Sequence, residues 1–119
     1  MHGLGDLEAA VMDVLWRAEE PLKVRDVLER LDRPLAYTTV MTVLDNLHRK
    51  QWAEREKDGR AYLYEASLSR EEASARALRS VLDASEDPQA VLVHFVAAVS
   101  DEETDLLRDA LRRKRVRRR

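Results

Sequence analysis

The chain contains no cysteine among its 119 residues. This absence excludes a disulfide framework, a thiolate zinc site and a cysteine nucleophile, and it favours a reducing, cytoplasmic location. The sequence also lacks any apolar run near the ~20 residues that span a bilayer. Its N-terminal segment has neither the basic nor the apolar region of a signal peptide. We therefore expect neither secretion nor insertion into a membrane.

The composition is that of a short, highly charged globular chain. Its length fits one domain, or a small domain with an appendage, and it excludes a two-lobed enzyme. Apolar residues make up 45% of the chain and charged residues 37%. This balance is typical of short amphipathic helices with charged outer faces rather than of disorder. We expect a mainly α-helical protein.

Three short helices are predicted in the first half of the chain. Apolar residues recur at helical spacing from Leu7 to Trp16, and again from Val24 to Leu31 after a short extended stretch at 22–24. Beyond Pro34 a third helix is predicted, with Thr38 or Thr39 as its N-cap. The apolar face predicted for the third helix consists of Val40, Val43, Leu44 and Leu47.

Beyond Lys50 the spacing of apolar residues changes from about four to two. Two alternating runs, 52–57 and 60–65, flank the pair Asp58-Gly59. This pattern predicts a β-hairpin with a type I′ turn, because both central positions of that turn need positive φ. Three helices followed by a hairpin is the order of a winged helix-turn-helix. The residues expected to pack the hairpin on the helices are Trp52, Leu63 and one of Tyr62 and Tyr64.

The outer face of the third helix suits DNA. Opposite the apolar side lie Thr38, Thr42, Asp45 and Arg49, whereas an ordinary solvated face favours long glutamate and lysine side chains. Short hydroxyl groups allow a helix to approach a groove closely. Asp45 would repel phosphates unless it reads a cytosine amine or pairs with Arg49, and we favour the pair. The residues predicted to contact DNA are Thr38, Thr39, Thr42, Asn46, Arg49 and Lys50 on the helix, with Lys57 and Arg60 in the wing.

The C-terminal part is predicted to be helical and to form a homodimer. Helix-start signals occur at Ser69–Glu72, at Asp87-Pro88 and at Ser100–Glu103. The middle helix is apolar on nearly every side from residue 90 to 99, and one small subunit cannot bury it. A twofold dimer would also present two recognition helices to a palindromic site. The residues predicted to form the dimer interface are Leu78, Val81, Leu82, Val91, Leu92, Phe95, Val96 and Leu107.

These elements divide the chain by function into a winged-helix DNA-binding domain, residues 1–67, and a helical dimerisation domain with a basic tail, residues 68–119. The net charge of −2 hides an uneven distribution. Acidic residues cluster in the first two helices, and the chain ends in a run of arginine and lysine from position 112. A solvated, frayed terminus is the simplest interpretation of this run, and a direct role on DNA is the alternative.

Three segments carry a resemblance to a known family. Residues 6–16 (DLEAAVMDVLW), 36–44 (AYTTVMTVL) and 58–64 (DGRAYLY) resemble the penicillinase repressor (BlaI/MecI) family, over residues 4 to about 113. The resemblance implies a cytoplasmic, homodimeric repressor that binds inverted repeats upstream of β-lactamase or related antibiotic-resistance genes. It also places three threonines in the recognition helix, at positions 38, 39 and 42, and Arg60 at the wing.

The resemblance bears on induction as well. Family members are often cleaved at an Asn-Phe bond after a membrane-bound sensor is activated, and the matching pair here is His94-Phe95, a candidate cleavage position. The copper-responsive branch of the family carries cysteine pairs that this chain lacks. His2, His48 and His94 lack the clustered spacing of a metal site. No metal and no cofactor are expected.

Two other classes of function compete with a repressor. The sequence has no nucleophile elbow, no phosphate-binding loop and no paired carboxylates, so we expect no enzyme. The more serious alternative is a winged helix that serves as a protein-interaction module, with the threonine face docked on a partner protein and no sequence-specific DNA binding.

Overall fold

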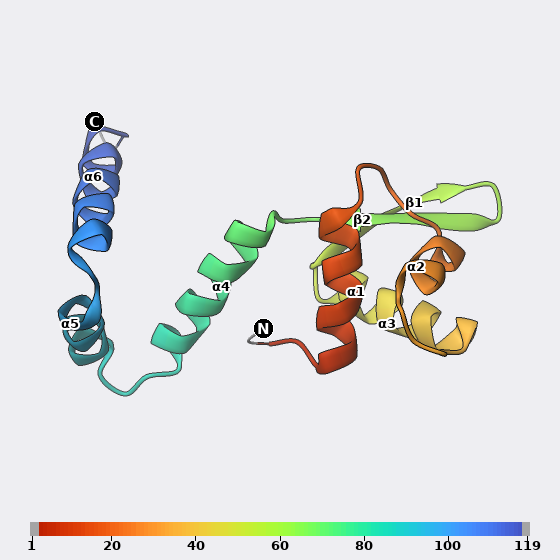
Figure 1. Ribbon diagram of the computed structural model, residues 1–119, viewed down its shortest axis with the longest axis horizontal. Coiled ribbons are helices and arrows are strands. Elements are labelled where there is room, and N and C mark those ends of the chain that lie inside the picture. The colour runs from red at the N-terminus through yellow and green to blue at the C-terminus, as the bar shows by residue number, and fades with distance from the viewer. Residues whose placement is uncertain (1–2, 118–119) are drawn as a thin grey trace. The chain divides into compact units, whose positions relative to one another are not determined.

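A computed structural model describes residues 3–117 as six helices and one antiparallel hairpin (Figure 1). The boundary between two compact units falls between Ser80 and Val81. The predicted order, three helices, a hairpin and further helices, is confirmed. The elements are α1 (Asp6–Arg17), α2 (Val24–Arg30), α3 (Tyr37–Arg49), β1 (Ala53–Asp58), β2 (Ala61–Ala66), α4 (Arg70–Asp83), α5 (Pro88–Ala98) and α6 (Asp101–Arg117).

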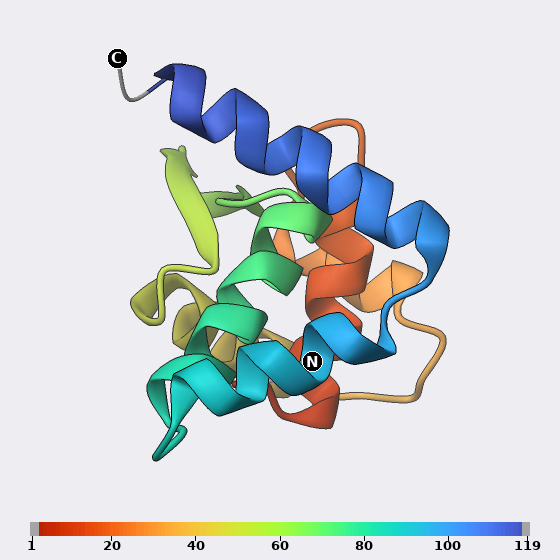
Figure 2. The ribbon, with the colours of Figure 1, turned by 90° about the vertical axis from the view of Figure 1, so that its left-hand side faces the viewer.

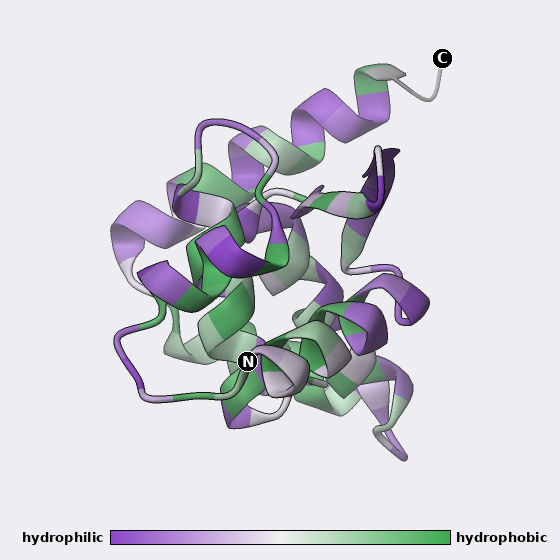
Figure 3. Cartoon of the chain, turned by 90° about the vertical axis from the view of Figure 1, so that its right-hand side faces the viewer, coloured by the Kyte–Doolittle hydropathy of each residue, from purple (hydrophilic) through white to green (hydrophobic). Residues whose placement is uncertain are grey.

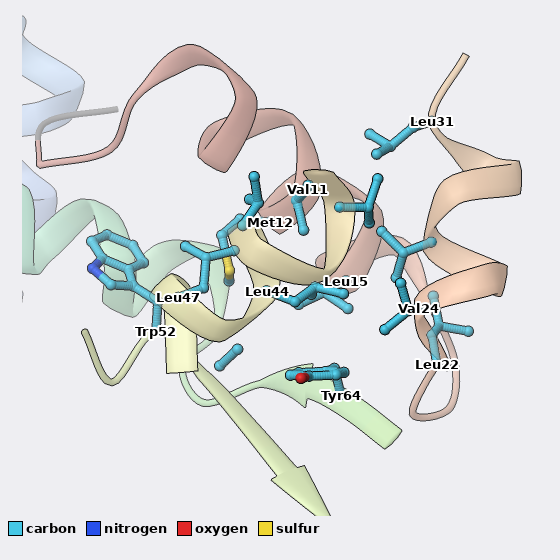
Figure 4. Packing of buried hydrophobic residues seen from close by; sticks show 14 of the residues in the cluster. Val11, Met12, Leu15, Leu22, Val24, Leu31, Leu44, Leu47, Trp52 and Tyr64 are labelled. Carbon is cyan, nitrogen blue, oxygen red and sulfur yellow. The ribbon is translucent and has the colours of Figure 1, made fainter. Parts of the chain in front are cut away.

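The core of the first unit lies between α1, α2, α3 and the hairpin (Figure 4). α1 contributes Val11 and Met12, both fully buried, and the whole predicted apolar face of α3 is buried. Each large apolar side chain moved out of water stabilises the fold by about 1.5–3 kcal/mol. This burial fixes the rotation of α3 about its axis, and so decides which of its side chains face solvent.

The hairpin forms where it was predicted, with a different turn. Asp58 pairs with Ala61, so the two loop residues are Gly59 and Arg60 rather than Asp58 and Gly59. Gly59 has φ +64°, whereas Arg60 is not among the residues with positive φ. A single positive φ, at a glycine in the first central position, is the pattern of a type II′ turn. The predicted type I′ turn is therefore wrong, because that turn needs positive φ at both loop residues and only Gly59 has it.

The extended stretch predicted at 22–24 joins the hairpin. Leu22 exchanges two backbone hydrogen bonds with Tyr64 of β2, at 2.8 and 2.7 Å. Tyr64 and Trp52 are buried in the core and pack the hairpin on the helices as predicted. Leu63 is only partly buried and is not among the side chains that pack against this core, so that part of the prediction is wrong.

α3 begins without the predicted N-cap and ends without the glycine that is common after a helix. It starts at Tyr37 after Ala36, and no side chain caps it, so neither Thr38 nor Thr39 is the N-cap. At its C-terminus the amide of Trp52 donates to the carbonyl of Leu47 at 2.9 Å, and Gln51 takes φ +67°. This is a Schellman motif in which glutamine fills a left-handed position that usually holds glycine.

The start of α4 is attached to α1. Ser69 and Glu72 form the predicted capping box, at 3.2 and 3.0 Å. The indole N–H of Trp16 donates to the carbonyl of Leu68 at 2.9 Å. Arg70 lies 4.9 Å from the Trp16 ring centroid and pairs with Asp13 at 2.7 Å. The first turns of α4 thus belong to the same compact unit as the winged helix, and the functional division at residue 67 stays a prediction.

The second unit holds two exposed helices. Asp87 caps α5 by accepting from the Ala90 amide at 3.1 Å, with Pro88 in the first turn as predicted. α5 has no buried residue. α6 starts with a capping box between Ser100 and Glu103 and continues through Arg117 (Figure 2). The basic segment is therefore helical through Arg117, and its last two residues lie outside the described residues.

No helix within residues 3–117 combines the length and the apolar character needed to cross a membrane.

Candidate nucleic-acid interface

The outward face of α3 is built from small polar groups. Thr38, Thr39 and Thr42 are all exposed, and the helical spacing predicted this for Thr38 and Thr42. The Thr42 hydroxyl donates to the carbonyl of Thr38 at 3.0 Å, which is one turn earlier on the same helix. Tyr37 and Met41 flank the threonines and are 49% and 43% exposed. No carboxylate lies among these five side chains, so an anionic groove meets no repulsion there.

Asp45, the one carboxylate on α3, is paired on both oxygens. Arg49 approaches one oxygen at 3.2 Å, which confirms the predicted intrahelical pair. Arg55 of β1 approaches the other oxygen at 3.1 Å, and sequence reasoning missed this second partner. Arg49 also donates to the Asn46 side-chain oxygen at 2.5 Å. Two guanidinium groups therefore offset the negative charge that counted against DNA binding.

Arg55 also connects the wing to the recognition helix. Its guanidinium carbon lies 4.3 Å from the centroid of the Tyr62 ring, and its side chain is only 25% exposed. A cavity of about 310 Å³ opens between helix and wing. One signal could have identified Arg55. Strand alternation places it on the same side of β1 as buried Ala53, so it points inward. The cavity is lined by Met41, Thr42, Asp45, Arg55, Tyr62 and Tyr64.

The wing carries two cations at its end. Lys57 is the last residue but one of β1, Arg60 lies in the turn, and both are exposed. Within the described part of the chain, neither side chain has a hydrogen bond or an ion pair. The end of the hairpin is accordingly among the most hydrophilic parts of Figure 3. Free cations at this position suit contact with a sugar-phosphate backbone.

Lys50 has a partner inside the protein. Its ammonium nitrogen lies 2.9 Å from the Glu8 carboxylate of α1. Glu8 also accepts from the Gly5 amide at 3.0 Å. Burial of Glu8 acts to raise its pKa, but the Gly5 N–H and the Lys50 charge outweigh burial, and the pKa is lowered. Lys50 thus holds the end of α3 against the start of α1, which distinguishes it from the free cations of the wing.

Comparison with known proteins decides what kind of winged helix this is. The model of the penicillinase repressor family matches residues 4–113. The chain belongs to the penicillinase repressor family. The transcriptional regulator BlaI of Mycobacterium tuberculosis (strain ATCC 25618 / H37Rv) is 49% identical over 113 residues, which cover 91% of this chain and 82% of that relative. The chain is therefore a DNA-binding transcriptional repressor and not an enzyme.

Solved structures of other regulators share the fold. MepR, a transcription regulator of the Staphylococcus aureus multidrug efflux pump MepA, matches with a TM-score of 0.51 and 18% identity, over 98% of this chain and 82% of that chain. Streptococcus pneumoniae FabT, solved in complex with DNA, matches with a TM-score of 0.50 and 20% identity, over 93% of this chain and 73% of that chain. At these identities the likeness supports the winged-helix fold of the repressor and nothing finer.

Proposed function

We propose that this repressor acts as a cytoplasmic homodimer on inverted-repeat operators, and that it controls β-lactamase or other antibiotic-response genes. The observation that carries the proposal is the exposed threonine face of α3 next to a wing with free cations. The two surfaces have different tasks. The α3 face reads base edges, while Lys57 and Arg60 fix the position of the protein on the backbone.

The residues proposed to contact DNA differ in how freely they can do so. Thr38, Thr39 and Thr42 need no rearrangement. Arg49 is exposed, but its guanidinium bridges Asn46 and Asp45, so a DNA contact by Arg49 or Asn46 exchanges this internal pair for an external one. Lys50 would have to leave Glu8, and it is the weakest member of the set.

The dimer proposal rests on apolar surface that a single chain leaves exposed. On α5, Leu92 is 46%, Phe95 50% and Val96 56% exposed, and on α4 Leu78 is 60% exposed. A cavity of about 330 Å³ between α5 and α6, lined mainly by apolar side chains, offers a further place for a partner side chain. Apolar surface of this extent normally marks an interface with another molecule. The other residues of the proposed interface are Val81, Leu82, Val91 and Leu107.

Proteolytic induction is the finer part of the proposal. His94 and Phe95 lie in the middle of α5, on exposed positions. In a separated subunit α5 has no buried side chain, so it would open locally at low cost when the proposed dimer dissociates, and a protease would then reach its backbone. Cleavage there would divide the proposed interface in two. Mass spectrometry of the repressor recovered from cells treated with a β-lactam should show fragments ending near residue 94, and an intact chain in derepressed cells would contradict this route.

A titration against DNA tests the main proposal. Affinity for the repressor's own upstream region should exceed affinity for a shuffled duplex, and both should fall as salt rises. Loss of all sequence preference would instead favour the protein-interaction module.

The dimer has its own test, because Leu92→Glu or Phe95→Glu should yield monomers in sedimentation and weaken operator binding at least tenfold. An unchanged dimer would remove α5 from the interface.

A further inference from the structure

The last turns of α6 carry cations that the interface described above does not use. Arginine or lysine fills every position from 112 to 119 except Val116. Arg112, Arg113, Lys114 and Arg115 are all exposed on the helix, and they are here named the basic end of α6. We propose that the basic end of α6 is a second DNA-binding surface, which binds backbone phosphates of the duplex independently of sequence.

Most of these cations have no partner within the part of the chain that the structure describes. Asp109 is bound to Arg113 at 2.5 Å. Three and four positions before Lys114 and Arg115 stand only Ala110, Leu111 and Arg112. No described hydrogen bond or ion pair engages Arg112, Lys114 or Arg115. Their charge is therefore available to an external anion.

Helix stability alone does not account for the group. The helix macrodipole favours one or two cations in the last turn. Beyond these, like charges three or four residues apart repel and destabilise a helix. Arg108, Arg112 and Arg115 follow one another at this spacing. The repulsion within this run lowers the stability of the helix in the free protein, and a bound polyanion would offset that loss.

On α3 and the wing, few cations are available to bind phosphates. Affinity for duplex DNA depends on the number of phosphates that Arg and Lys neutralise. Yet Arg49, Lys50 and Arg55 are already paired with carboxylates, and only Lys57 and Arg60 are free on the wing. Acidic residues also outnumber basic ones across residues 1–80. The basic end of α6 supplies the positive charge that this unit lacks.

The chemistry of the group suits phosphate. A guanidinium is planar, always charged and able to donate two parallel hydrogen bonds to a phosphate. Three of the four residues at the basic end are arginine. The other anion available would be the first turn of α6 in a second copy, with Asp101 and Glu102. Glu103 of that turn is already engaged by the Ser100 amide at 2.9 Å, which weakens this alternative.

The test compares two full-length variants. R112Q/K114Q/R115Q removes three charges but keeps good helix formers, and R112K/R115K keeps every charge. Fluorescence anisotropy measures affinity for the upstream region and for a random duplex over a range of salt concentrations. For the glutamine variant, the slope of log K against log salt should become less negative by about 0.9 for each phosphate that the variant no longer neutralises. Affinity for both duplexes should fall at least tenfold, whereas the lysine variant should retain the parent slope.

Two results would overturn the proposal. Equal slopes for the parent and the glutamine variant would show that these cations do not touch DNA. Equal slopes together with sedimentation as a monomer would place them against a second copy instead. Circular dichroism checks that both variants keep the helix content of the parent. A parent that binds without sequence preference would count against the proposed operator binding, yet would leave the slope comparison intact.

Discussion

Arg55 of the wing and Asp45 of α3 lie 3.1 Å apart, so one ion pair links the two elements that are proposed to face DNA. The pair is only partly exposed, and Tyr62 covers the guanidinium from one side. The orientation of the wing relative to α3 therefore depends on side chains that are not themselves free to contact phosphates.

Arg55→Gln should weaken DNA binding about tenfold while leaving the salt slope unchanged, because the residue positions the wing and neutralises no phosphate. Asp45→Asn should act in the same direction. In the double variant the two effects should not add, with a coupling energy of about 0.5–3 kcal/mol between residues in contact. Anisotropy titrations of the parent, the two single variants and the double variant measure this coupling energy. Additive effects would show that the ion pair does not fix the orientation of the wing.

Opposite faces of α3 should separate stability from DNA binding. Leu44→Ala leaves a cavity in the core and should cost about 2–5 kcal/mol in the free energy of unfolding. Met41→Ala, on the exposed face, should change stability by less than about 0.5 kcal/mol and lower DNA affinity. Urea unfolding and a binding titration on both variants give the comparison. A large loss of stability for Met41→Ala would show that this face is packed rather than free.

The left-handed residue after α3 offers a stabilising change. Gln51→Gly should raise the free energy of unfolding by about 0.5–1 kcal/mol, because glycine takes positive φ without the steric cost of a Cβ. Gln51→Ala serves as the matched control and should give no such gain, since alanine keeps the Cβ. Thermal melts of the three proteins decide, and an equal gain from alanine would contradict the backbone explanation.

The attachment of α4 to α1 should depend on pH. The hydrogen bond and charge of Arg70, joined by Arg17, lower the pKa of Asp13 below its usual 3.8. A lowered pKa in the folded state means that stability from this group is present above pH 3.8 and is lost as the pH falls below it. Arg70→Gln should therefore show a shallower loss of stability than the parent between about pH 5 and the acid limit of folding. Identical pH profiles would exclude this contribution.

Much of the fold could be predicted because local chemistry and the final packing agree. The period of α3 placed Val40 and Leu44 in the core, and this also placed Thr38 and Thr42 outside. Capping boxes at Ser69 and Ser100 formed as the sequence indicated. Each of these features depends on residues within one turn of one another.

The features that sequence reasoning missed depend on distant partners. Strand alternation places Arg55 on the inward side of β1, but no local pattern identifies Asp45 and Tyr62 as its partners. Lys50 meets Glu8 only because α1 and α3 are packed together. The hairpin turn shifted by one residue because cross-strand register, set by packing, decided which residues enter the loop.

The exposed sides of α5 would also affect regulation if the proposed dimer forms through them. A dimer forms only when two subunits associate, so the dimeric fraction of the protein rises with the amount synthesised. In the proposed dimer, halving the amount of repressor would lower the concentration of operator-competent molecules by more than half. Small differences in expression or turnover would thus be enough to switch a promoter on.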